Sequence, residues 1–119
     1  MAEQHVLTGS IAFGKPLVAQ AGGVAHVRVE DVTLVDAAST AVAQVNLPLS
    51  GVAAHTTSLP FTLTVPDVDA ARRYAVRVHI DHSGNGRVEP GDQISVQSYP
   101  VLTQGAQSDV TVAVVPVQG

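Results

Sequence analysis

The chain has 119 residues, a length typical of one domain, and 45% of them are hydrophobic, which is enough for a packed core. Its net charge is −4 and only 3% of its residues are aromatic, so it lacks the basic faces and stacking aromatics that nucleic-acid binding requires. No apolar run is long enough to span a membrane, and there is no cysteine for disulfide or thiol chemistry. We expect one domain over residues 1–119, with residues 1–4 outside its folded part.

The first two apolar runs, residues 5–13 and 24–34, each predict a β-strand. In the first, residues of one parity would face the core: Leu7, Ile11 and Phe13. In the second, the inward parity changes after Val29, and a β-bulge at Glu30–Asp31 would turn both halves inward. The inward residues of that strand would then be Val27, Val29, Val32 and Leu34.

Five further strands are predicted: residues 41–49, 58–65, 74–81, 93–101 and 109–115. Pro60 indicates that its strand starts late or lies at a sheet edge. Residues 66–73 are the only helical candidate, a single turn at most, capped by Asp67 or Asp69. The spacing from Asp69 to Tyr74 is typical of a tyrosine corner, and a tyrosine that only fills the core is the alternative.

Seven short strands at this spacing predict an all-β fold. The arrangement that the spacing favours is a two-sheet antiparallel β-sandwich with Greek-key-like connections. The sequence shows no internal repeat, linker or low-complexity segment, which is consistent with a single domain.

Residues 81–92, with the sequence DHSGNGRVEPGD, resemble the calcium-binding loop of an EF-hand. The oxygen ligands at places one, three, five, seven, nine and twelve would be Asp81, Ser83, Asn85, the Arg87 carbonyl, Glu89 and Asp92. Gly86 at place six permits the sharp turn that closes such a loop. Strands replace the usual flanking helices and place twelve holds an aspartate, so a Ca²⁺ site here would be weak to moderate. The alternative is a plain hairpin loop, because Asp, Asn and Gly also favour turns.

A second candidate metal set overlaps this loop. His79 and Asp81 lie two residues apart on a strand and therefore face the same side, and His82 follows directly. Imidazole and carboxylate groups suit zinc or other transition metals, but a third ligand is needed. It could come from the histidines elsewhere in the chain if the fold brought one near: His5, His26 and His55. Surface histidines without a metal are the alternative.

Catalysis finds little support in the sequence. Asp81, His82 and Ser83 are the residue types of a catalytic triad, but three consecutive residues cannot form its side-chain relay. The chain has no Gly-x-Ser-x-Gly elbow and no glycine-rich phosphate loop. We therefore expect a protein that is not an enzyme.

Six segments, taken in order, are similar to the YbaY/YscW-type lipoprotein family, which includes the lipoprotein chaperones (pilotins) of type III secretion. The segments are residues 8–11 (TGSI), 29–33 (VEDVT), 60–63 (PFTL), 74–78 (YAVRV), 91–95 (GDQIS) and 97–103 (QSYPVLT). The likeness extends from about Val6 to Val115, and the Glu-Asp-Val and Ser-Tyr-Pro-Val-Leu segments are its most specific parts.

The resemblance implies a small β-sandwich in the bacterial envelope, in the periplasm or at the outer membrane, held there by an N-terminal lipid. Pilotin members help an outer-membrane secretin reach its place, so a protein partner is implied and no catalytic residues are. The sequence contains no signal segment and no lipidated cysteine, so membrane association is expected only with an N-terminal lipid anchor, and a cytoplasmic location stays open. The expected function is non-enzymatic and protein-binding or chaperone-like, and the alternative is a calcium-binding β-module that uses the loop at residues 81–92.

Overall fold

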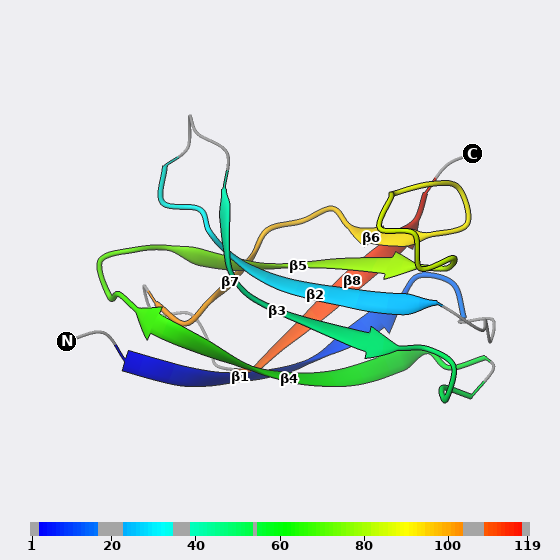
Figure 1. The fold of residues 1–119 in the computed structure, drawn as a ribbon, viewed down its shortest axis with the longest axis horizontal. Coiled ribbons are helices and arrows are strands. Elements are labelled where there is room, and N and C mark those ends of the chain that lie inside the picture. Colours follow the sequence, from blue (N-terminus) through cyan, green and yellow to red (C-terminus); the bar gives the residue numbers. More distant parts are fainter. Residues whose placement is uncertain (1–2, 17–22, 35–38, 54, 104–108, 118–119) are drawn as a thin grey trace.

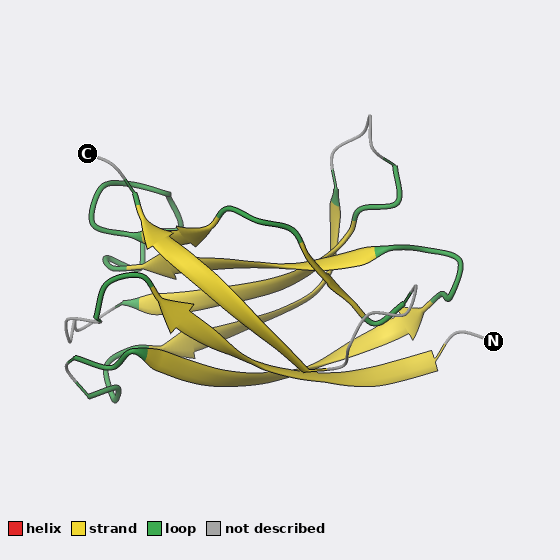
Figure 2. Cartoon of the chain, turned by 180° about the vertical axis from the view of Figure 1, so that it is seen from behind, coloured by secondary structure: helices red, strands yellow, loops and turns green. Residues whose placement is uncertain are grey.

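The computed structural model describes residues 3–16, 23–34, 39–53, 55–103 and 109–117. Within these ranges all the regular elements are strands, which confirms the all-β prediction (Figures 1 and 2). The strands are β1 (Glu3–Phe13), β2 (Val24–Asp31), β3 (Thr40–Pro48), β4 (Ser58–Val68), β5 (Tyr74–Asp81), β6 (Gln93–Ser95), β7 (Tyr99–Val101) and β8 (Asp109–Pro116). None of the described residues forms a helix that is long and apolar enough to cross a membrane.

The strands form one mixed sheet that curls on itself. Its order is β3-β2-β5-β6-β8-β1-β4, and β7 pairs with the other half of β5. β1 and β8 run parallel, whereas the other paired strands are antiparallel. The end strands β3 and β4 also contact each other, so the sheet is a nearly closed barrel. The expected two-sheet antiparallel sandwich is therefore corrected: β8 bonds to both β6 and β1 and joins what would have been two separate sheets.

The core lies inside the curled sheet and is made mainly of aliphatic side chains. The inward faces predicted for residues 58–65 and 74–81 are confirmed, because alternate apolar residues of β4 and β5 are buried. Their neighbours are exposed in β4, whereas in β5 only Arg77 is exposed, His79 is half-buried, and Ala75 and Asp81 are buried as well. The fully buried side chains at the centre are Leu7, Ile11, Val27, Val29, Val65, Val76, Val112 and Val114. Burying a side chain of this size contributes roughly 1.5–3 kcal/mol relative to leaving it in water.

Two predicted elements differ from the structure. The strand expected at residues 93–101 is divided into β6 and β7, because residues 96–98 leave the sheet. Next to the break, Ser95 Oγ accepts a hydrogen bond from the Val78 amide at 3.0 Å. The helical turn expected at residues 66–73 does not form as a helix. β4 instead continues to Val68, and Asp69 Oδ1 accepts from the Ala71 amide at 2.9 Å in a tight turn.

The tyrosine corner and the bulge are both present. The Asp69 amide donates to the Tyr74 hydroxyl at 3.1 Å and the tyrosine is buried, so the tyrosine corner forms and the alternative, a tyrosine that only fills the core, is wrong. The β2–β3 register shifts between Val29 and Glu30, close to the predicted place, but the extra residue, Val42, lies on β3. The predicted bulge on β2 itself is therefore wrong: β2 ends at Asp31, and Leu34 lies beyond it and is exposed instead of facing inward. Pro60 lies on β4, which is an end strand of the sheet, so the prediction that Pro60 marks an edge strand is confirmed.

Candidate functional site

The loop between β5 and β6 is built around the carboxylate of Asp81. Asp81 is the last residue of β5 and is fully buried. Its Oδ1 accepts from the Gly84 amide at 3.0 Å, and its Oδ2 accepts from the Gly86 amide at 2.7 Å. Gly84 and Gly86 have φ angles of 73° and 79°, a left-handed conformation that glycine adopts without strain, and this conformation turns both amides toward the carboxylate. Burial alone raises the pKa of Asp81, but these amides and His26 outweigh it and lower the pKa below its ordinary value.

The middle of the loop brings three of the predicted calcium ligands together. Glu89 Oε1 accepts from Ser83 Oγ at 2.8 Å and from Asn85 Nδ2 at 3.1 Å. Asn85 Oδ1 accepts from the Arg87 amide at 2.9 Å, which closes the turn. The residues at places three, five and nine therefore contact one another. The Asn85 oxygen, which is the atom that would bind Ca²⁺, is bonded to the Arg87 amide instead of facing Glu89.

Asp92, at place twelve of the loop, is also buried but lies among histidines and amides. Its Oδ2 is 2.7 Å from His79 Nε2, and its Oδ1 accepts from the His82 amide at 3.0 Å and is bonded to His82 Nδ1. The Glu89 amide donates to Oδ2 at 3.2 Å. Burial raises the pKa of Asp92, but these bonds, led by that of His79, hold it below its ordinary value. The bond to Asp92 in turn raises the pKa of His82.

The structure divides the predicted metal residues into two groups. Ligand atoms of His82, Glu89 and Asp92 lie within 4.8 Å of one another. Ligand atoms of His26, His79 and Asp81 form a second group with the same limit. Ligand atoms of His79 and Asp81 therefore lie close together, in keeping with their expected common face, whereas His82 belongs to the other group. Neither group, as found among the described residues, includes His5 or His55.

His26 is the member of the second group that sequence reasoning could not select. It pairs directly with His79 across β2 and β5, and the two ring centroids are 5.4 Å apart. Only this register distinguishes His26 from the other histidines of the chain. The sequence does indicate that His26 faces outward, because it shares its parity with Arg28. His79 faces outward in the same way, because it shares its parity with Arg77.

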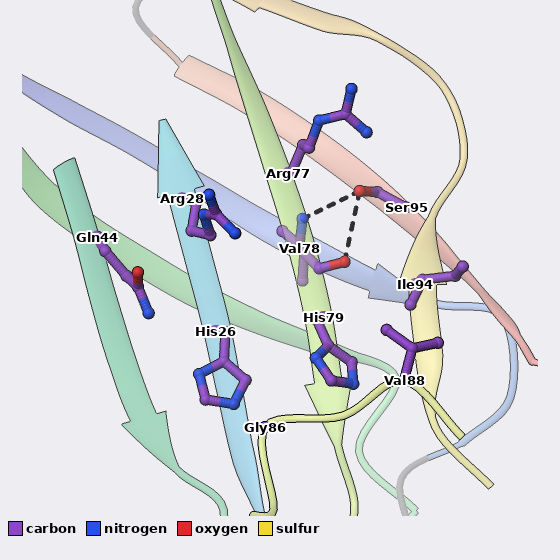
Figure 3. Close-up of a pocket in the computed structure, with 10 residues that line it drawn as sticks. All are labelled: His26, Arg28, Gln44, Arg77, Val78, His79, Gly86, Val88, Ile94 and Ser95. Atoms are coloured by element: carbon purple, nitrogen blue, oxygen red, sulfur yellow. Dashed lines mark hydrogen bonds between the residues drawn. The ribbon is translucent and has the colours of Figure 1, made fainter. Parts of the chain in front are cut away.

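A pocket of about 470 Å³ opens beside the two histidines, on the outer face of the sheet. Figure 3 shows His26 and His79 side by side at one end of it, near Gly86 of the loop, with Arg28 and Arg77 farther along the same strands. Both arginines bind Glu30, at 3.1 Å and 2.6 Å, so their charges are partly neutralised. Val88 and Ile94 form an apolar side of the pocket.

Comparison with known proteins assigns the chain to a family. Residues 2–114 match the model of the type III secretion system lipoprotein chaperone (YscW). A solved structure, described as an alternative pilotin from the type II secretion system of Vibrio cholerae, superposes with a TM-score of 0.80. The two sequences are 28% identical over 98% of this chain and 100% of the other. No curated protein matches significantly. Because the family model covers nearly the whole sequence, the chain belongs to the type III secretion system lipoprotein chaperone (YscW) family.

Proposed function

We propose that this protein is a non-enzymatic, protein-binding module of the bacterial envelope that acts as a chaperone for a secretin subunit. The observation that carries the proposal is the match of residues 2–114 to a family of secretion-system lipoprotein chaperones. The structural likeness to a pilotin over the full length of both chains supports it. In this proposal a lipid anchor supplied N-terminally would hold the domain at the membrane.

The surface offers a place where a partner could bind. The sheet opens between β6 and β7, and a shallow pocket of about 110 Å³ lies there with Val32 and Val96 in its lining. Val96 is 65% exposed, so an incoming apolar side chain could cover it. Each end strand of the sheet, β3 and β4, pairs with only one strand among those described, so a strand edge is a second place for an incoming segment.

We expect the purified protein to bind secretin subunits of its own organism, and Val96→Asp to weaken this binding at least about tenfold, as loss of a buried apolar contact does. Stability should change little because Val96 is already exposed. Isothermal titration calorimetry with soluble secretin segments measures both affinities. Val6→Asp on β1, where the valine is 60% exposed, is the matched control. Absence of binding by the wild-type protein would contradict the proposed function. Equal loss in both variants would contradict only the assignment of the surface.

Calcium binding by the loop at residues 81–92 is a second candidate function. The observation that favours it is the convergence of Ser83, Asn85 and Glu89, together with the amide cradle around Asp81. Ca²⁺ prefers oxygen ligands presented by alternate residues of such a loop. Asp81 and Asp92 are unsuitable positions for a test because both are buried and hold the loop backbone. Glu89 is suitable because its side chain is 35% exposed.

We expect millimolar Ca²⁺ to raise the Tm of the wild-type protein relative to chelator, and Glu89→Gln to abolish most of the rise. A ligand present at a hundredfold excess over its Kd stabilises the folded state by about 2.7 kcal/mol. The glutamine keeps an oxygen that can accept from Ser83 and Asn85, so it removes the charge and preserves the hydrogen bonds. Asp109→Asn, which removes an exposed carboxylate outside the loop, is the control variant, and Mg²⁺ is the control ion. An unchanged Tm in wild-type protein would make the segment a plain hairpin loop.

A further inference from the structure

We propose that His26, His79 and Asp81 form a binding site for a divalent transition-metal ion of the zinc type, separate from the oxygen ligands of the calcium candidate except for Asp81. Two imidazoles and one carboxylate are a common ligand set for such ions. The site lies where β2 and β5 pair, at the end of the strands next to the loop. The proposal does not depend on the chaperone function.

The backbone fixes the three ligands relative to one another. His26 and His79 are direct cross-strand partners, and Asp81 follows His79 by two residues on the same face. The side chain of Asp81 is fully buried, and one oxygen of its carboxylate faces His26. His26 Nε2 and Asp81 Oδ2 are 3.1 Å apart. Two ligand atoms that are each about 2.0 Å from a tetrahedral ion lie roughly 3.3 Å apart, so little movement is needed.

The hydrogen bonds around the histidines leave the correct nitrogens for a metal. His26 Nδ1 lies 2.9 Å from Asn46 Oδ1, which also accepts from Gln44 Nε2, so Nδ1 carries the donated proton. Nε2 of a neutral ring then presents a lone pair to the Asp81 carboxylate. In this tautomer the ring nitrogen and the carboxylate oxygen both offer lone pairs to a metal ion placed beside them.

His79 is held in the same manner by a carboxylate. Its Nε2 donates to Asp92 Oδ2 at 2.7 Å, which leaves Nδ1 as the nitrogen for a ligand bond. A histidine ligand whose second nitrogen donates to a carboxylate or amide oxygen is the usual outer arrangement of protein zinc sites. Asp81 is oriented in turn by the Gly84 and Gly86 amides. All three ligands therefore have the supporting contacts that a metal site requires.

The remaining coordination position faces open space. His26, His79 and Gly86 line the pocket of about 470 Å³ on the outer face of the sheet (Figure 3). A zinc ion with three protein ligands takes water or an external group as its fourth ligand. The pocket has room for either.

The test is zinc titration by calorimetry on protein stripped with a chelator, together with Co²⁺ absorption as a direct report of nitrogen ligation. We expect one Zn²⁺ per chain, and visible Co²⁺ bands typical of four-coordinate geometry. His26→Gln and His79→Gln should each weaken zinc binding about 100-fold or more, beyond the usual effect of an outer contact. His55→Ala, which removes a histidine outside both groups, should have no effect. Thermal unfolding of each variant without metal verifies that it is folded.

Two further variants separate this site from its neighbours. Glu89→Gln should reduce any calcium effect and leave zinc affinity unchanged, because Glu89 is not a proposed zinc ligand. His82→Gln should likewise leave zinc affinity within about threefold of the wild-type value, a difference of the size expected for a residue that is not a ligand. Zinc binding that survives His26→Gln but is lost in His82→Gln would place the metal in the His82, Glu89 and Asp92 group and overturn the proposal. The absence of zinc binding by the wild-type protein would overturn it as well.

Discussion

Gly9→Ala is expected to destabilise the protein by about 3 kcal/mol, the upper part of the usual range for overpacking a core. An alanine Cβ at this position would collide with the Val110 carbonyl oxygen of β8 and lie 2.6 Å from Phe61 Cζ of β4. The backbone oxygen cannot move without opening the β1–β8 pairing. On conformational entropy alone the same change would stabilise the strand by less than about 1 kcal/mol, so the clash decides the sign.

Chemical denaturation of both proteins measures this effect, and a Tm lower by roughly 10 °C or more should accompany it. Gly51→Ala is the matched control because a Cβ there meets nothing within 4 Å. It should alter the free energy of unfolding by no more than about 0.5 kcal/mol. Equal effects of the two substitutions would show that Phe61 does not occupy the space above Gly9.

Gly9 also shows what the sequence could and could not predict about the fold. Its parity with Leu7 and Ile11 places it on the inward face of β1, and the strand itself followed from that alternation. The requirement for glycine at this position follows only from the residues paired with it. Phe61 lies opposite Gly9 in one neighbouring strand, and Val110 lies opposite it in the other. Pairing between residues about 50 or 100 positions apart leaves no local signal in a sequence.

The same limit explains the topology. The parallel pairing of β1 with β8 converts the expected pair of sheets into one curled sheet. Alternation reports which face of a strand is buried. It does not report which strand lies beside it, or whether the sheet forms part of a sandwich or a barrel. The division of residues 93–101 was equally hidden, because it depends on Ser95 Oγ bonding to the backbone of Val78 in another strand.

The candidate site was predictable to the extent that it is local. The loop at residues 81–92 has a recognisable spacing, and His79 and Asp81 share a face by strand geometry alone. His26 joins them only through the β2–β5 register, which no local pattern reports. The conflict between a calcium loop and a histidine site was also partly hidden, because the sequence does not show that Asp92 is bonded to His79 and His82.

Asp92→Asn is expected to lower the free energy of unfolding by about 3 kcal/mol near pH 6, the cost of removing one partner from a buried ion pair. The carboxylate receives bonds from His79, His82 and the Glu89 amide and is almost fully buried. An asparagine would place N–H groups against at least one of these donors. The protein should stay folded, because the barrel core does not include this side chain.

The pH dependence of that loss identifies its origin, because the two partners titrate in opposite directions. The pKa of Asp92 lies below its ordinary value of 3.8, so its contribution is fully present above that pH and is lost as the pH falls through the lowered pKa. The pKa of His82 lies above its ordinary value of 6.5, so its contribution is fully present below that pH and is lost as the pH rises through the raised pKa. The difference between wild type and Asp92→Asn should therefore be largest from pH 3.8 to 6.5 and smaller on both sides.

Urea denaturation at several pH values, with chelator present so that no metal contributes, measures this profile. Asp109→Asn, which removes an exposed carboxylate on β8, should follow the wild-type profile throughout. A difference that stays constant from acid to alkaline pH would mean that Asp92 acts by filling space and accepting from amides, without its charge. A maximum between the two limits would show that the loop is held by a charged aspartate–histidine pair, the same Asp92 that orients His79 toward the proposed metal ion.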